Sequence, residues 1–170
     1  MLYVLPILVL LFVEQAASVC APHFESVMEP GAAGARAVER CYRFVPTRVS
    51  YKRADEHCRG IGGLVVYIDN VGQARFLHGL AADRQITTYW IGLRKGDGVW
   101  TFERPAGAAA AQRFYNWRRK STGRDEPDGL VGTDVTCAIA GFVKKQPEWD
   151  DTSCTTPPSN VDGYICRREP

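Results

Sequence analysis

Six cysteines are the sequence feature that most limits how this chain can fold. An even number of cysteines in a secreted chain indicates disulfide bonds, and their spacing alone leaves the connectivity open. No CxxC pair is present and the three histidines are scattered, which argues against a zinc site. The cysteines stand at positions 20, 41, 58, 137, 154 and 166.

The start of the chain predicts an oxidising, extracellular destination. An apolar run from Leu2 to Val13 is shorter than the roughly 20 residues that a membrane span needs. Ala16 and Ser18 then stand where a signal peptidase reads small residues. We therefore expect residues 1–18 to be a signal peptide cleaved before Val19, with an uncleaved anchor as the alternative. The mature chain is then secreted and has no membrane span.

The composition fits one ordinary globular domain. The chain has 170 residues, of which 45% are hydrophobic and 24% are charged. Its net charge is +2, and removing the leader takes away only Glu14, which makes it +3. This excess of positive charge is too small to indicate a nucleic-acid partner, and no motif of such proteins supports one. We expect no nucleic acid as a partner.

Two helices are predicted in the first half of the chain. Ser50 is suited to cap a helix that runs through Arg59. Asn70, with Gln73 three residues later, is suited to cap a second helix. The expected apolar faces are Tyr51, Ala54 and Cys58 in the first helix, and Val71, Ala74, Leu77 and Leu80 in the second.

Strands and loops dominate the second half. Residues 89–93 and 99–102 flank RKGDG, which suits a tight turn between two strands. We expect residues 21–40 to form a loose N-terminal loop and residues 118–136 a long surface loop. With helices early and strands late, the fold class is α+β. Further strands are expected at 41–45, 62–68, 137–143 and 163–166.

Eight short motifs together carry a family resemblance. Taken in this order, they resemble the C-type lectin and C-type lectin-like domain family, in its long-form, single-domain secreted members. The resemblance runs from Cys41 to Cys166, roughly three quarters of the chain. The motifs are CYRF (41–44), ADEHC (54–58), WIGL (90–93), GVWTF (98–102), FYNW (114–117), EPD (126–128), EWDDTSC (148–154) and GYIC (163–166).

The resemblance implies an architecture. It predicts the C-type lectin-like fold, with two helices, antiparallel sheets, a long calcium-binding loop region and disulfide staples. The domain is expected at 41–168, after an N-terminal extension at 19–40. The implied disulfides are Cys58 with Cys166, Cys137 with Cys154 and, as in long-form members, Cys20 with Cys41. The WIGL residues Trp90, Ile91 and Leu93, and also Trp100 and Trp117, are expected to pack in the interior.

Two acidic segments are the candidate metal site. DEPDG and WDD lie on either side of Cys137, and Ca²⁺ takes roughly six to eight oxygen ligands in flexible geometry. In sugar-binding members of the family, the EPN or QPD triplet, an acid after it and a late Asn-Asp pair hold the ion, and the central proline is cis. The alternative is that the acids merely solvate a surface loop. Carried over to this chain, the calcium ligands are Glu126, Asp128, Asp134, Asp150 and Asp151.

The chain departs from the family pattern in ways that bear on sugar specificity. Asp128 and Asp150 replace asparagines, and an ionised carboxylate accepts hydrogen bonds but cannot donate them. Asp134 stands three residues before Cys137, where the family usually has Glu two before. The EPD triplet combines the glutamate of mannose-type sites with the aspartate of galactose-type sites, so both classes stay open. We expect calcium binding to be better supported than tight mannose binding.

These features predict a secreted, calcium-dependent, carbohydrate-binding lectin that recognises glycans or microbial surfaces, as in innate immunity. The alternative is a protein-binding or structural module that uses calcium only to stabilise the loop. No nucleophile and base are legible together, so we do not expect an enzyme. The basic run RRKSTGR (118–124) either attracts acidic glycans or is a solvated face, which is the more common case. The expected carbohydrate-binding residues are Glu126, Asp128, Asp150 and Asp151.

Overall fold

The computed structural model of the protein describes residues 19–31, 35–106, 114–130, 134–143 and 146–170. The predicted signal peptide, residues 1–18, lies outside these ranges, as does most of the alanine-rich stretch at 106–111. Within the described ranges, neither helix has the length and apolar character needed to cross a membrane.

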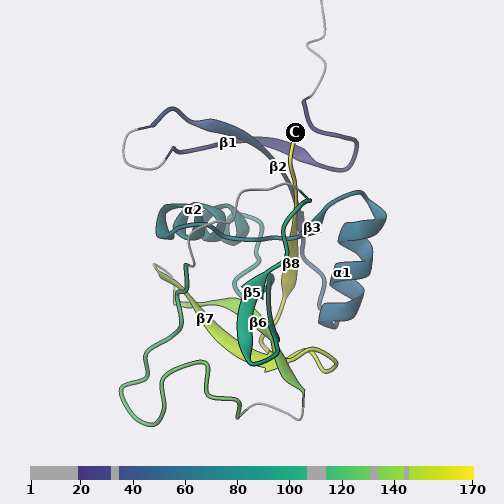
Figure 1. The fold of residues 1–170 in the computed structure, drawn as a ribbon. Helices are drawn as coiled ribbons and strands as arrows, with labels where there is room; N and C mark the ends of the chain where they lie inside the picture. Colours follow the sequence, from purple (N-terminus) through teal and green to yellow (C-terminus); the bar gives the residue numbers. More distant parts are fainter. Residues whose placement is uncertain (1–18, 32–34, 107–113, 131–133, 144–145) are drawn as a thin grey trace, which may run out of the picture.

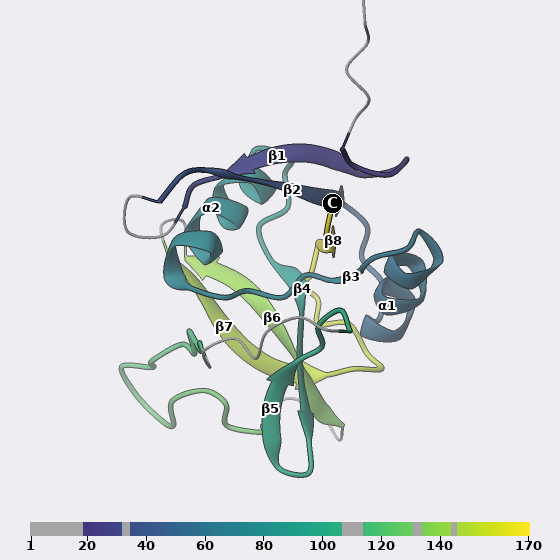
Figure 2. The same ribbon diagram turned by 45° about the horizontal axis from the view of Figure 1, so that its top comes forward.

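A single sheet organises the described chain. Its strands follow the order β1-β2-β8-β4-β6-β7, with β3 beside β8 and β5 beside β4. All described strand pairs are antiparallel except β4 with β8. The helices α1 and α2 flank the sheet on opposite sides (Figures 1 and 2). The bounds are β1 Glu25–Glu29, β2 Val38–Val45, α1 Tyr51–Gly60, β3 Leu64–Val65, α2 Val71–Ala82, β4 Tyr89–Gly96, β5 Val99–Phe102, β6 Val135–Val143, β7 Gln146–Ser153 and β8 Gly163–Arg168.

Both predicted helix starts are confirmed by their caps. The Ser50 hydroxyl accepts a hydrogen bond from the backbone N–H of Arg53 at 3.4 Å. The Asn70 side chain accepts one from the N–H of Gln73 at 2.9 Å. These caps satisfy backbone donors that have no partner inside the helix. The expected apolar faces are buried except at the two ends of α2, where Val71 at the start is exposed and Leu80 in the last turn is half-buried; the buried members are Tyr51, Ala54, Cys58, Ala74 and Leu77.

The N-terminal segment differs from the prediction of a loose loop, which was wrong. Residues 25–29 and 38–45 pair as an antiparallel hairpin, β1 with β2. A charged residue, Glu29, is buried in it, and its carboxylate accepts hydrogen bonds from the Tyr42 hydroxyl at 2.5 Å and from the Gln73 amide at 3.1 Å. A charged residue at this inward-facing position breaks the alternation of polar and apolar residues by which a strand is recognised. Because its partners lie far along the chain, the sequence did not show that Glu29 could be buried.

Three disulfides staple the fold, and their pairing confirms the one that the family resemblance implied. Cys20 is bonded to Cys41 in β2, Cys58 in α1 to Cys166 in β8, and Cys137 in β6 to Cys154 just after β7. The WIGL motif lies in β4 and is interior as expected, with Trp90, Ile91 and Leu93 fully buried. On the chain-entropy account, each bridge stabilises the fold by restricting the unfolded chain.

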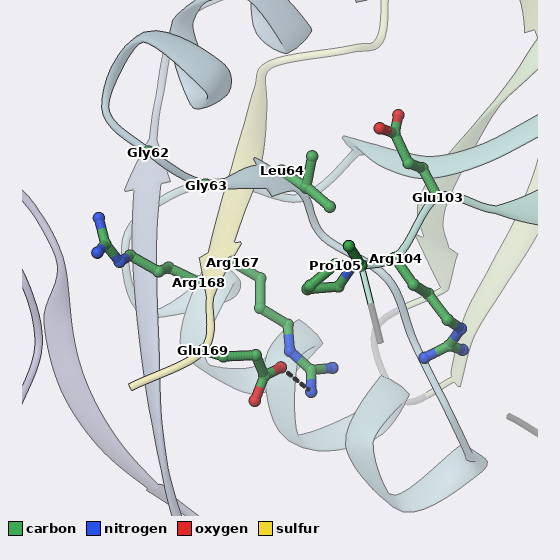
Figure 3. A pocket seen from close by; sticks show the side chains of 10 residues that line it. Gly62, Gly63, Leu64, Glu103, Arg104, Pro105, Arg167, Arg168 and Glu169 are labelled. Atoms are coloured by element: carbon green, nitrogen blue, oxygen red, sulfur yellow. Dashed lines mark hydrogen bonds and ion pairs between the residues drawn. The ribbon is translucent and has the colours of Figure 1, made fainter. Parts of the chain in front are cut away.

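A cavity of about 580 Å³ opens beside the end of β8 (Figure 3). Three arginines line it, but two of them are already neutralised by acids. Arg104 pairs with Asp69 at 2.6 Å, and Arg167 pairs with Asp69 at 3.2 Å and with Glu169 at 3.0 Å. The Arg167 guanidinium also lies 3.8 Å from the centre of the Tyr67 ring. These pairs tie β8 to the segment before α2 and leave little charge for a ligand.

Candidate functional site

The site begins where the loop at 114–130 runs alongside β7. The backbone N–H of Arg118 donates to the carbonyl of Trp149 at 2.9 Å, and the N–H of Trp149 donates to the carbonyl of Asn116 at 2.8 Å. Trp117 and Trp149 thereby form a parallel bridge. The sequence did not reveal β7 as a strand. Its pairing with the loop brings Arg118 beside Asp150, the residue that follows Trp149.

An aromatic cluster holds the loop in this position. Trp149 is fully buried, and three rings meet its indole edge-on. The ring centres of Phe102, Phe114 and Trp117 lie 5.6, 5.3 and 6.0 Å from that of Trp149. Trp100 in turn packs on Trp117 at 5.0 Å. Trp100 is buried and Trp117 is partly buried against the core, so both have a packing role, and their packing supports the chain that leads into the acids.

Three of the five predicted ligands converge. Glu126 and Asp128 flank Pro127, whose peptide bond with Glu126 is cis, as expected from the family pattern. One carboxylate oxygen from each of Glu126, Asp128 and Asp151 lies within 4.8 Å of the other two. The Asp151 carboxylate also accepts hydrogen bonds from the backbone N–H groups of Asp128 at 3.1 Å and Gly129 at 3.0 Å. Asp151 thus joins β7 to the loop.

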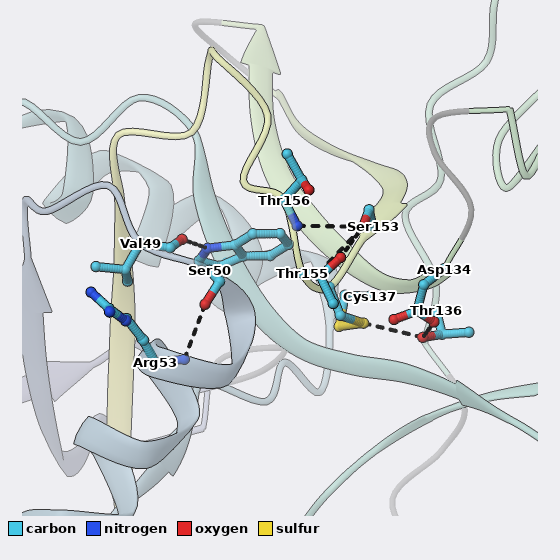
Figure 4. Close-up of a disulfide and its surroundings, with 11 residues drawn as sticks. Val49, Ser50, Arg53, Asp134, Thr136, Cys137, Ser153, Thr155 and Thr156 are labelled. Carbon is cyan, nitrogen blue, oxygen red and sulfur yellow. Dashed lines mark hydrogen bonds between the residues drawn. A yellow bond between two sulfur atoms is a disulfide. The ribbon is translucent and has the colours of Figure 1, made fainter.

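The structure places the other two predicted ligands outside this group. Asp150 is only 8% exposed and accepts a hydrogen bond from Arg118, while its Oδ1 atom has no hydrogen-bond partner among the described residues. Asp134 is exposed near the Cys137–Cys154 disulfide, where it accepts a hydrogen bond from the Thr136 hydroxyl at 3.0 Å (Figure 4). Asp150 therefore adjoins the three acids, whereas Asp134 does not.

Two cations lie among the acids. The Lys120 ammonium forms ion pairs with Glu126 and, at 2.6 Å, with Asp128. The Arg118 guanidinium pairs with Asp150 and lies 3.4 Å from Glu126. The interpretation of residues 118–124 as a solvated face is wrong for these two residues, although Arg119 and Arg124 are exposed. The sequence offered one signal of these ion pairs, since the basic run RRKSTGR is followed directly by the acidic segment DEPD.

The pKa values follow this distribution of charge. The hydrogen bond from Lys120 lowers the pKa of Asp128. Burial by itself would raise the pKa of Glu126, but hydrogen bonds, first that of Lys120, bring it below its usual value. Burial and the nearby Glu126 charge raise the pKa of Asp150 to about 7. Burial, and then the Glu126 carboxyl group, also raise the pKa of Asp151. Asp150 and Asp151 are therefore the two acids whose charged form the site disfavours, mainly because they are buried.

These residues fit a hard divalent cation. The donors are all carboxylate oxygens, which Ca²⁺ prefers. The Oδ1 atom of Asp150 adjoins them and, among the described residues, has no hydrogen-bond partner. A buried charged oxygen of this kind lowers the stability of the fold unless a donor or a cation pairs with it. A cavity of about 420 Å³ opens next to Glu126 and is lined by Tyr115, Asn116, Trp117, Arg119 and Asp125 as well. A molecule bound at the acids would therefore have room to extend along the loop.

Comparison with known proteins identifies the class. Residues 47–168 match the family described as the lectin C-type domain, which is more than half of the chain. The chain therefore belongs to the C-type lectin domain family. Carbohydrate binding is typical of this family, calcium commonly takes part in it, and its members are typically binding proteins rather than enzymes, although some bind no sugar.

Individual relatives share the fold at low sequence identity. L-selectin of Bos taurus is 25% identical over 116 residues, which cover 66% of this chain and 29% of that protein, so the chain spans less than a third of its length. The carbohydrate-recognition domain of cow CD23, crystallised with a GlcNAc2Man3 oligosaccharide present, is 20% identical, with a TM-score of 0.62 over 89% of this chain and 96% of that one. A calcium-independent type II antifreeze protein is 17% identical, with a TM-score of 0.61 over 89% and 95%.

Proposed function

We propose that this protein is a secreted lectin that binds carbohydrate through a calcium ion held by Glu126, Asp128 and Asp151. The observation that supports the proposal most is the convergence of these three carboxylates from the loop and from β7. Asp150 would add a fourth carboxylate from the same strand. Asp134, which lies apart from them, is the weakest of the five candidates that the sequence offered.

A bound Ca²⁺ would supply coordination positions for two neighbouring sugar hydroxyls. The carboxylates of Glu126, Asp128, Asp150 and Asp151 would accept hydrogen bonds from these hydroxyls. None of the four can donate a hydrogen bond when ionised, so the sugar oxygens must find donors elsewhere. The side-chain amide of Asn116, which lines the adjoining cavity, would be one such donor, since it has a second N–H besides the one that it donates to the Pro147 carbonyl.

The disulfides and the predicted signal peptide support an extracellular setting for this calcium-dependent function. The predicted signal peptide at 1–18 would carry the domain into an oxidising compartment, and all six cysteines are paired in disulfides, which persist there. We propose that the mature chain begins at Val19, with an extension at 19–40 and the lectin domain at 41–168. Its targets would be glycans, including those on microbial surfaces.

A glycan array tests the sugar-binding proposal. The full mature chain is applied in calcium chloride and again in EDTA, and retained protein is eluted with free monosaccharide. We expect retention on a subset of glycans in calcium, loss of the signal in EDTA and elution by mannose or galactose, whichever class the array identifies. Signal that persists in EDTA, or no glycan bound in calcium, would contradict the proposal.

One observation favours a second candidate, a protein-binding or structural module. The three acids contain no amide donor, and the cations of Arg118 and Lys120 already pair with acids of the site. The loop is thereby held without a sugar. In this case calcium would raise the melting temperature while the array stayed blank, and any protein partner would be retained in the presence of free sugar.

The missing amide donors lead to a prediction about specificity. Changing Asp128→Asn together with Asp150→Asn restores two N–H donors, each worth on the order of 1 kcal/mol when it satisfies a sugar oxygen. We expect mannose affinity to rise by about thirtyfold, since the two donors total about 2 kcal/mol and each 1.4 kcal/mol corresponds to a factor of ten. Titration of mannose in calcium by calorimetry measures it, and Asp134→Asn, at an exposed acid apart from the group of three, is the control. Unchanged mannose affinity would remove the donor argument.

A further inference from the structure

Lys120 lies in the centre of the acidic site. Its side chain is 28% exposed, whereas the side chains of its partners Glu126 and Asp128 are 0% and 2% exposed. Two of the three carboxylates proposed to hold calcium are therefore paired with a cation that belongs to the chain itself. The pairing is with the carboxylate oxygens, which are the atoms that a calcium ion would need.

The loop backbone holds Lys120 in this place. The N–H of Lys120 donates to the Asp125 carboxylate at 3.0 Å, and the N–H of Glu126 donates to the carbonyl of Arg118 at 3.0 Å. These two bonds close the segment 118–126 on itself, so that the lysine side chain leads back to the acids that follow it. The contact thus arises from the closed loop as well as from attraction between charges.

The ammonium and a calcium ion would compete for the same oxygens. Two cations a few ångströms apart repel each other strongly where water is partly excluded. Lysine can move its charge away, because it is a point charge on a flexible four-carbon stem. When all four carboxylates are ionised, Arg118 and Lys120 leave a net charge of −2 on the site (four acids, two bases), and one Ca²⁺ would offset it.

We propose that Lys120 is an internal counter-cation that holds Glu126 and Asp128 in their binding arrangement in the absence of calcium, and that calcium displaces it. This rests on the proposed calcium site. Lys120 then has two effects. It keeps the loop folded at low calcium, and it lowers calcium affinity, because its ion pairs must break before the metal binds. Calcium affinity is thereby set by a residue that is not a ligand.

The test compares Lys120→Met with Arg119→Met, which removes the same charge from the exposed neighbouring residue. Thermal unfolding in EDTA and calorimetric titration with calcium chloride are measured on the mature chain. We expect K120M to melt below both the wild type and R119M in EDTA. We also expect it to bind calcium about tenfold more tightly, the factor for one charge-assisted hydrogen bond that no longer has to break. R119M should match the wild type, and Lys120→Arg should retain wild-type stability in EDTA.

The outcomes separate this inference from the proposed function. If the wild type binds calcium and K120M has the same affinity, the counter-cation role is overturned and the calcium site stands. Loss of calcium binding in K120M would also overturn it, because Lys120 would then support the bound state. If only K120M binds calcium, the competition is upheld and the calcium-dependent function of the natural chain falls. If neither binds calcium, both fall. A K120M chain that folds only in calcium would be the strongest support.

Discussion

Asp151→Ala is expected to abolish the stabilisation of this protein by calcium. Asp151 is almost fully buried and is the one member of the acidic group that comes from β7. Without it, Glu126 and Asp128 stand on a single loop and offer the ion too few ligands. A ligand present at 100 times its Kd stabilises the folded state by about 2.7 kcal/mol, and this increment should vanish. The melting temperature, with calcium and with EDTA, measures it.

The controls separate loss of the metal from damage to the loop. Asp151→Ala also removes one acceptor of the Asp128 N–H, which keeps the Glu126 carboxylate at 3.2 Å, and the acceptor of the Gly129 N–H. Asp151→Asn keeps an oxygen for one of them while removing the charge, so it should lose the calcium response with a smaller loss of stability in EDTA. Asp134→Ala, outside the group, should keep the full calcium response. An equal loss from Asp134→Ala would restore Asp134 as a ligand, and a full response in D151A would refute the site.

Trp149→Ala is expected to lower the free energy of unfolding by about 3–5 kcal/mol, the range for removing a large aromatic side chain from a packed core. The indole is fully buried and is the ring against which Phe102, Phe114 and Trp117 pack. The change leaves a cavity that these rings can fill only in part. Urea denaturation with the disulfides intact measures the loss.

A second readout of Trp149→Ala concerns the site. Because Trp149 packs against the chain that leads into the acids, calcium affinity should fall along with stability. Phe76→Ala is the control, since Phe76 is a half-buried aromatic residue on α2 that is not among the described rings packed on Trp149. It should cost less and leave calcium affinity unchanged. A smaller loss for W149A than for F76A would mean that the indole is not the centre of this packing.

The features that the sequence predicted are mostly local ones. Ser50 and Asn70 cap the helices through contacts three residues away, and such contacts follow from spacing. The turn between β4 and β5 is equally local. The disulfide pairing and the approach of Glu126 to Asp151 are non-local, and the sequence indicated them only through the family resemblance. When the spatial arrangement of a family's short motifs is known, these motifs thus indicate contacts between distant residues that the sequence of this chain alone does not.

The features that the sequence did not predict depend on contacts between distant residues. The charge of Glu29 argues against a buried strand, and its burial is explained only by the hydrogen bonds that Tyr42 and Gln73 donate to it. Strand β7 contains three acids and a proline, and it is recognisable only once β6 and the loop pair with it. Lys120 belongs to a basic run that resembles a solvated surface. Its ion pairs with Glu126 and Asp128 become visible only once the closed loop brings these acids to it.

The ends of the described chain and the acidic loop lie at opposite poles of the molecule. Strand β1 and the C-terminus share one end, and residues 114–130 extend from the other (Figures 1 and 2). A support or a fusion partner attached through either terminus would thus leave the acids facing outward, toward a cell wall or a sensor chip. Several copies attached side by side in this way would present parallel binding sites, so that weak individual contacts would combine into tighter overall binding.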